Sequence, residues 1–208
     1  MKIKLQWWVW GLILLACAAY FLPWIWNPAA ALAPNAHDLA EWTTLHPAAR
    51  QMTPPLLPSF FLRANLGILA VLIILKTTST NSKWIGRLLA LGLIILMLPP
   101  ADFLISARDD INYQQQFYLS TFTFLLVLAA SFGASKLPTL TQKALILLTI
   151  ILGIIAGIWG LLLGLNIYVR LGIGSAVGVG CILFCSVLLV LGAEDLFSIV
   201  TQHKNRSR

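Results

Sequence analysis

Six long apolar runs divide the chain, and short polar segments separate them. The runs cover residues 7–26, 59–75, 84–105, 117–134, 144–168 and 171–193. About 20 apolar residues in a helix are enough to cross the hydrocarbon core of a bilayer. The pattern predicts an all-α membrane bundle of six transmembrane helices in a single domain, residues 1–208. The last run continues to Val200, but Glu194 and Asp195 would be costly at depth, so this span is predicted to end near Ala193.

The longest segment between the runs, residues 27–58, is interrupted by six prolines. Between Pro34 and Pro47 there is room for one short helix, with Asn35 as its cap and Asp38 in its first turn. Three apolar positions of this helix share one face: Leu39, Trp42 and Leu45. The pattern predicts an interfacial helix in the first outer loop, lying flat on the membrane surface with Trp42 as its anchor.

Tryptophans stand at both ends of the first run: Trp7, Trp8, Trp10, Trp24 and Trp26. Tryptophan is enriched at membrane interfaces, so we expect these residues to form an inner and an outer belt. Within the run, Cys17 follows a sequence that loosely fits a lipoprotein signal. The apolar residues that continue after Cys17 favour an uncleaved first helix over a processed lipoprotein.

Composition and charge agree with a membrane protein. Only 10% of the residues are charged and 59% are hydrophobic, whereas a soluble domain is about 25% charged. The formal charge of +7 does not indicate nucleic-acid binding, because the lysines and arginines stand singly between apolar runs. If the N-terminus is cytoplasmic, ten of the 14 Lys and Arg residues fall in cytoplasmic segments. The positive-inside rule therefore predicts that both termini are cytoplasmic, in a bacterial cytoplasmic membrane.

Small residues recur at helical spacing in the fifth and sixth predicted helices. They are Gly153, Gly157, Gly160 and Gly164 in the fifth, and Gly174 and Gly178 in the sixth. Faces of this kind let two helix backbones approach closely. We therefore expect these two helices to form a tight hairpin.

Chemistry-bearing residues gather in the segments predicted to lie outside: Asp38, Glu41, His46, Arg50, Arg63, Asp102 and Arg108. If they converge on one pocket, an enzyme acting on a lipid or exported substrate is possible. Arg63, one turn inside the second run, can snorkel to the surface or form an ion pair with Asp102. Before Asp102, Pro99 and Pro100 are expected to break the third helix, which restarts as a short interfacial helix or, less favoured, lines a cavity.

We expect no metal and no cofactor. His37 and Glu41 can share a helix face, but a metal site needs a third ligand, and His46 lies more than two turns from His37. The chain has three histidines, all outside the runs, and no nucleotide-binding motif. Ser175 has no suitable base, because the only histidine that follows it is His203.

Three functions remain as hypotheses. The leading one is a non-catalytic accessory or scaffolding subunit, whose partners are the lipid bilayer and other membrane subunits or copies of itself. The second is the membrane-spanning component of an ABC-type permease, although the cytoplasmic loops leave little room for a coupling helix. The third is the outer-face enzyme. The middles of the runs contain no charged residue, which argues against ion-coupled transport.

Overall fold

The computed structural model describes residues 2–27, 32–77 and 83–206. Its helices are α1 (Lys2–Tyr20), α2 (Ala36–Leu45), α3 (Pro47–Arg50), α4 (Leu57–Thr77), α5 (Lys83–Ile95), α6 (Asp102–Ile105), α7 (Ile111–Gly133), the 3-10 helix η1 (Ala134–Lys136), α8 (Thr139–Arg170) and α9 (Val179–Arg206). Two short strands, β1 (Ile25–Trp26) and β2 (Ala176–Val177), pair antiparallel.

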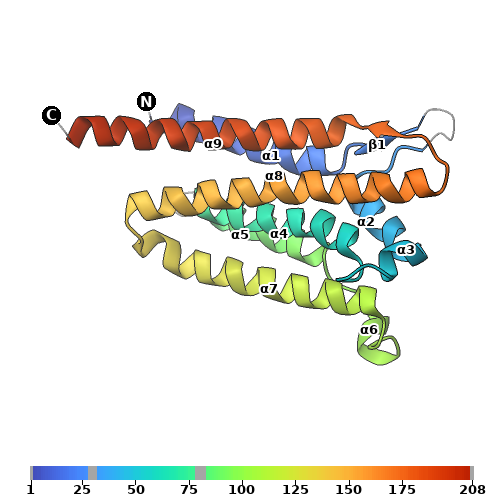
Figure 1. Ribbon diagram of the computed structural model, residues 1–208. Coiled ribbons are helices and arrows are strands. Elements are labelled where there is room, and N and C mark those ends of the chain that lie inside the picture. The colour runs from blue at the N-terminus through green and yellow to red at the C-terminus, as the bar shows by residue number, and fades with distance from the viewer. Residues whose placement is uncertain (1, 28–31, 78–82, 207–208) are drawn as a thin grey trace.

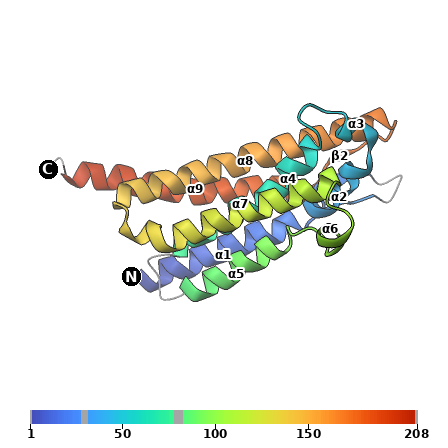
Figure 2. The ribbon, with the colours of Figure 1, turned by 90° about the horizontal axis from the view of Figure 1, so that it is seen from below.

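The long helices form an elongated bundle and run alternately in opposite directions (Figure 1). The first and last described residues lie at the same end, which we call the terminal end. The opposite end carries α2, α3, α6 and the two strands, and we call it the α2 end (Figures 1 and 2). The predicted all-α bundle is therefore confirmed.

Among the described residues, four helices are long and apolar enough to cross a membrane: Leu57–Thr77, Ile111–Lys136, Thr139–Arg170 and Val179–Thr201. Two further helices are shorter. The apolar part of α1 is Trp7–Tyr20, and α5 has 13 residues. By length and composition, four membrane-spanning helices are supported.

The centre of the bundle is α4. It packs against α8, α5, α7 and α2. In the most apolar stretch of α4, 67% of the residues are buried, whereas in the corresponding stretches of α7 and α9 only 22% are. Other helices therefore surround most of α4. Leu62, Leu66 and Ile73 are fully buried on it.

The first helix ends at Tyr20, six residues before the predicted end. Pro23 has no amide hydrogen with which to continue a helix, and the chain instead folds back, with the Trp24 amide donating to Pro34 O at 2.9 Å. Trp24 is fully buried, and its ring lies 5.5 Å from that of Phe184. The prediction that Trp24 belongs to an interfacial belt is therefore wrong, while Trp26 is 50% exposed.

The third predicted helix is broken earlier than expected. Its regular part, α5, ends at Ile95, and the next residues form turns, such as Leu98 N to Ile95 O at 3.1 Å. Residues that precede proline disfavour helical geometry, and Pro99 and Pro100 follow directly. As predicted, a short helix (α6) starts after the prolines, at Asp102.

The sixth helix starts after the predicted start of its span and continues beyond the predicted end of that span. Residues 171–178 are not helical, because their backbone turns at Gly172 (φ 71°) and pairs through β2 with β1. The helix α9 starts at Val179 and continues past Ala193. Beyond the predicted end of the span, the two carboxylates of this helix pair with Lys76, which lies 2.6 Å from Asp195 and 3.5 Å from Glu194.

Helices α8 and α9 pack against each other. The glycines of α8, however, contact other elements as well as α9. A Cβ atom added at Gly153 would lie 2.9 Å from Leu188 of α9, and one at Gly157 would make ordinary contacts with Trp24 and Phe184. Towards the α2 end, the glycine face of α8 contacts other helices: Gly160 lies against Leu62 of α4, and Gly164 lies against Leu39 of α2.

The two predicted glycines of the sixth helix do not face α8. Gly174 has open space around it. Gly178 lies against the backbone of Pro23 and Trp24, where its amide donates to Trp24 O at 2.7 Å. The expected matching of two glycine faces is therefore wrong, since this part of the chain is a strand and a turn.

Candidate functional site

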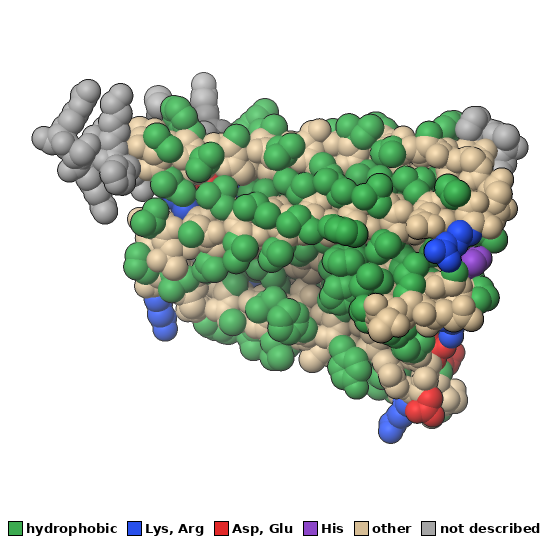
Figure 3. Space-filling model, viewed as in Figure 1, with side chains coloured by type: hydrophobic (Ala, Val, Ile, Leu, Met, Phe, Trp, Pro, Cys, Tyr) green, Lys and Arg blue, Asp and Glu red, His purple; other side chains and the backbone are tan. Residues whose placement is uncertain are grey.

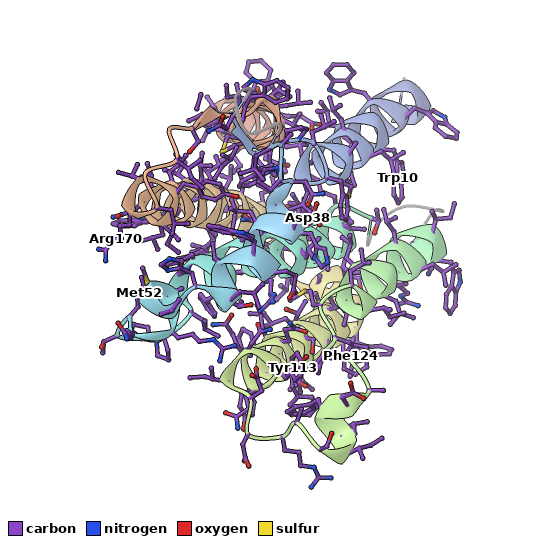
Figure 4. All side chains as sticks on the ribbon, turned by 90° about the vertical axis from the view of Figure 1, so that its right-hand side faces the viewer. Trp10, Asp38, Met52, Tyr113, Phe124 and Arg170 are labelled. Carbon is purple, nitrogen blue, oxygen red and sulfur yellow. The ribbon has the colours of Figure 1, made fainter. Side chains whose placement is uncertain are left out.

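The helix α2 forms where the sequence predicts it and helps to build the polar site. Asn35 caps it, accepting from the Asp38 amide at 2.9 Å, and its side-chain amide donates to Asp38 Oδ2 at 2.8 Å. Such a cap satisfies amide groups that have no partner within the helix. In Figure 4, α2 with Asp38 lies across the middle of the α2 end.

The buried face of α2 differs in part from the predicted one. It comprises Ala36, Leu39, Ala40, Thr43 and Thr44. Leu45 is 75% exposed, so its assignment to the apolar face is wrong, because the helix ends there and α3 takes the chain in a new direction. Trp42 packs inward, with its ring 4.3 Å from that of Tyr168. The contacts of α2 with α4 and α8 hold it in the bundle.

The centre of the site is Arg63, whose side chain is only 2% exposed. Its Nη2 lies 2.5 Å from Glu41 Oε1 in α2. Its Nη1 donates to Asn112 Oδ1 in α7 at 2.7 Å and to Ser59 Oγ in α4 at 3.2 Å. One guanidinium thus joins three helices.

Two glutamines of α7 extend this network. Gln116 Nε2 donates to Glu41 Oε1 at 3.3 Å. Gln115 accepts from Ser59 Oγ at 2.6 Å and donates to Leu56 O at 3.2 Å. We call the six side chains the Arg63 cluster: Glu41, Ser59, Arg63, Asn112, Gln115 and Gln116.

The electrostatics of the Arg63 cluster are balanced. A buried charge is tolerated when it is paired and hydrogen-bonded, and Arg63 has one carboxylate and several neutral acceptors. The Glu41 side chain is 45% exposed, so the pair meets solvent on the carboxylate side. Nearby, the Tyr20 hydroxyl is buried without a hydrogen-bond partner among the described residues, within the field of Arg63, Glu41 and Asp38.

The remaining predicted residues of α2 and α3 have local structural roles. His46 Nδ1 accepts from the Ala48 amide at 3.1 Å and so caps α3. Arg50 Nε donates to Thr44 O at 2.8 Å, and its Nη2 lies 3.7 Å from Asp110 Oδ2. These contacts fasten α3 to α2 and to the start of α7.

Asp102 and Arg108 are exposed on or next to α6, which projects from the side of the bundle (Figure 1). Arg108 Nη2 donates to Leu104 O at 3.1 Å. The predicted ion pair of Arg63 with Asp102 is wrong, because Glu41 takes the place of the carboxylate. Of the seven predicted residues, the structure joins only Glu41 and Arg63 directly.

The α7 members of the Arg63 cluster were not predicted from the sequence. They precede the predicted start of the fourth span, residue 117, whereas α7 starts at Ile111 with Asp110 as its cap. Asp110 accepts from the amides of Asn112 and Tyr113 at 2.8 and 3.2 Å. A capping residue followed by amides at 112, 115 and 116, on one helix face, was a signal that could have found them.

Within the residues that the structure describes, no three His, Cys, Asp or Glu side chains are placed to hold a metal ion. The Arg63 cluster itself offers one carboxylate, so its chemistry is hydrogen bonding and charge pairing.

Comparison with known protein families, curated proteins and solved structures gives no match to this chain, so its geometry has to carry the functional conclusion.

Proposed function

We propose that this protein is a non-catalytic multi-pass membrane protein that serves as an accessory or scaffolding subunit of a larger membrane assembly. The observation that carries the proposal is the Arg63 cluster. Its only base and its only acid pair with each other, and its amides bond to that pair and to the backbone. The strongest polar group at the α2 end is thereby used to hold α2, α4 and α7 together, which leaves no free general base, nucleophile or ligand set within the cluster.

The proposal includes six spans, with α1 and α5 added to the four long helices and with both termini in the cytoplasm. The alternating helix directions support it (Figure 1). The charges support it as well: α4, α5 and η1 have Lys76, Lys83 and Lys136 in their first or last turns at the terminal end, whereas Asp102 starts α6 at the α2 end and Asp109 follows it. Basic residues favour the cytoplasmic side. The α2 end would then face outward from a bacterial cytoplasmic membrane.

The centre of the bundle supports a scaffold more than a permease. Between Arg63 and Lys76, α4 carries one polar side chain, Asn65, whose amide donates to Phe61 O at 3.1 Å. The rest of this stretch is apolar and mostly buried. A transport path needs polar groups that face water at this depth.

The test is purification of the tagged full-length protein from its native membrane in mild detergent, with quantitative mass spectrometry of what accompanies it. We expect a membrane protein, or further copies of this chain, at fixed stoichiometry, and we expect reciprocal tagging of that companion to recover this chain. A monodisperse monomer without a stoichiometric companion would contradict the proposal.

A further inference from the structure

An apolar groove lies on the side of the bundle between α7 and α8. Its volume is about 610 Å³, and α4 forms its floor. The floor includes Ala64 and Val71, while Phe122 and Leu126 line the α7 wall and Leu152 and Ile155 line the α8 wall. Figure 3 shows this side of the molecule, with apolar side chains of α8 and α7 above and below the groove.

The course of the chain explains the groove. At the terminal end, α7 and α8 are joined by η1 and a short turn, and towards the α2 end they diverge (Figure 1). The groove lies between these diverging helices, and along α4 its lining reaches from Val71 to Phe60, towards the α2 end. No charged side chain is among the residues that line it. Of its polar residues, Gln115 is bonded to Leu56 O, and Thr149 Oγ1 donates to Leu145 O at 2.7 Å.

A groove of this composition needs an apolar occupant. Water does not fill apolar cavities, because it finds no hydrogen-bond partners there. An unfilled groove would forfeit the dispersion contacts of its walls. In a bilayer the two apolar candidates are a lipid chain and a helix of another protein.

The dimensions distinguish the two. Along α4 the groove reaches from Phe60 to Val71, eleven residue steps or about 16 Å, which is about half of the hydrocarbon core and so one leaflet. A partner helix that crosses the membrane would pack along the whole core of about 30 Å, about twice the length of the groove, whereas one acyl chain lies within one leaflet. The volume of the groove is within the range of pockets that bind small molecules.

We propose that the groove binds the acyl chain of a membrane lipid from the leaflet at the α2 end. The lipid headgroup then lies beyond Phe60, near Gln115 and Tyr118, at the end of the groove closest to the α2 end. Arg63 is already paired with Glu41, so the headgroup meets no free charge within the groove. The site selects its ligand by the chain, and phospholipids of different headgroup charge bind equally well. This proposal does not depend on the subunit function.

The test uses full-length protein, delipidated in mild detergent and titrated with phosphatidylcholine or phosphatidylglycerol of the same chains, with native mass spectrometry as the readout. We expect one lipid to bind each protein molecule, with affinities for the two headgroups within about threefold. Ala64→Phe and Ile155→Trp each fill the groove, and we expect them to weaken binding at least tenfold. Ala18→Phe, at an exposed position of α1, is the matched control and keeps the lipid.

A second measurement guards against misfolded variants. Added lipid raises the Tm of the delipidated wild type and of Ala18→Phe, whereas Ala64→Phe, whose groove is already filled, gives no rise. Equal binding by the groove variants and the control would overturn the proposal. So would a tenfold preference for the anionic lipid. A photoreactive residue at position 126 that cross-links in native membranes to another protein, and not to lipid, would show that a partner helix occupies the groove.

Discussion

At the scale of single residues, two cations of the described chain have side chains that are almost fully enclosed, and both are held in a similar way. Arg63 near the α2 end is paired with Glu41, and Lys76 at the other end is paired with Asp195 and Glu194. The side chains of Arg63 and Lys76 are 2% and 7% exposed. Removal of one partner leaves a charge that is both desolvated and unpaired, which costs much more than the loss of a surface pair.

Glu41→Gln is expected to lower the free energy of unfolding by about 1–3 kcal/mol. The amide can keep a hydrogen bond to Arg63 but cannot neutralise it, and the partial exposure of Glu41 keeps the loss below that of a fully buried pair. The measurement is the thermal transition in detergent. Asp38→Asn is the control, since this residue is exposed on the same helix and, among the described residues, forms its hydrogen bonds with Asn35. Equal transitions for both variants would contradict the structural importance of the pair.

Lys76→Gln is expected to cost about 3 kcal/mol or more, because it leaves two neighbouring carboxylates of α9 without their cation. The loss should appear as a lower Tm and as faster proteolysis of the C-terminal part of α9. Lys136→Gln removes an exposed lysine near the same end and should leave both readouts unchanged. If the two variants behave alike, the ion pairs with α9 do not stabilise the bundle.

At the scale of elements, the small face of α8 determines how closely α4 can approach it. At Gly160, an added Cβ atom would lie 2.9 Å from Leu62 Cγ and 3.1 Å from its backbone nitrogen. At Gly157, one turn away, the nearest atom would be at 3.5 Å, an ordinary contact. The two glycines thus differ in the space around them, although their spacing in the sequence suggests equal roles.

Gly160→Ala is therefore expected to destabilise the protein by about 1–3 kcal/mol, because α4 and α8 must separate. Gly157→Ala should be neutral or stabilising, because alanine favours a helix by up to about 1 kcal/mol over glycine. Thermal unfolding of both variants in the same detergent measures the difference. If the two alanine variants are equally stable, or if Gly157→Ala is the less stable one, then Gly160 does not set the distance between α4 and α8.

The comparison of sequence and structure is instructive at this scale. Helices with strong local signals were predicted well: α2 starts after its Asn35 cap, and α6 follows Pro100. Ends that depend on distant partners were not. Residues 21–26 and 171–178 are apolar enough for a helix, yet they pair with each other and with residues 32–35, a contact that no local pattern reveals. Two of the six members of the Arg63 cluster, Glu41 and Arg63, were candidates, and their pairing depends on the packing of α2 over α4.

At the scale of the whole molecule, the proposed six-span arrangement gives each end of the bundle its own side of the membrane. The prediction is tested by single cysteines in a protein whose three native cysteines are replaced by serine. Asp109→Cys should react with a membrane-impermeant maleimide in intact cells. Lys136→Cys should react only after the membrane is permeabilised. Both positions are exposed, so labelling of both from one side would contradict the topology.

The unequal lengths of the helices have a consequence for the surrounding bilayer. The 32 residues of α8 extend for about 48 Å, whereas the 13 residues of α5 extend for about 20 Å, shorter than a hydrocarbon core of about 30 Å. In a six-span arrangement, α8 is therefore longer than the hydrocarbon core on one side of the molecule, and α5 is shorter than it on the other side. The protein must tilt, or the lipid beside α5 must thin. Along the α5 side, either response favours lipids with shorter chains and membrane proteins with a shorter hydrophobic surface. The thickness of the bilayer alone therefore directs such neighbours to the α5 side of the molecule.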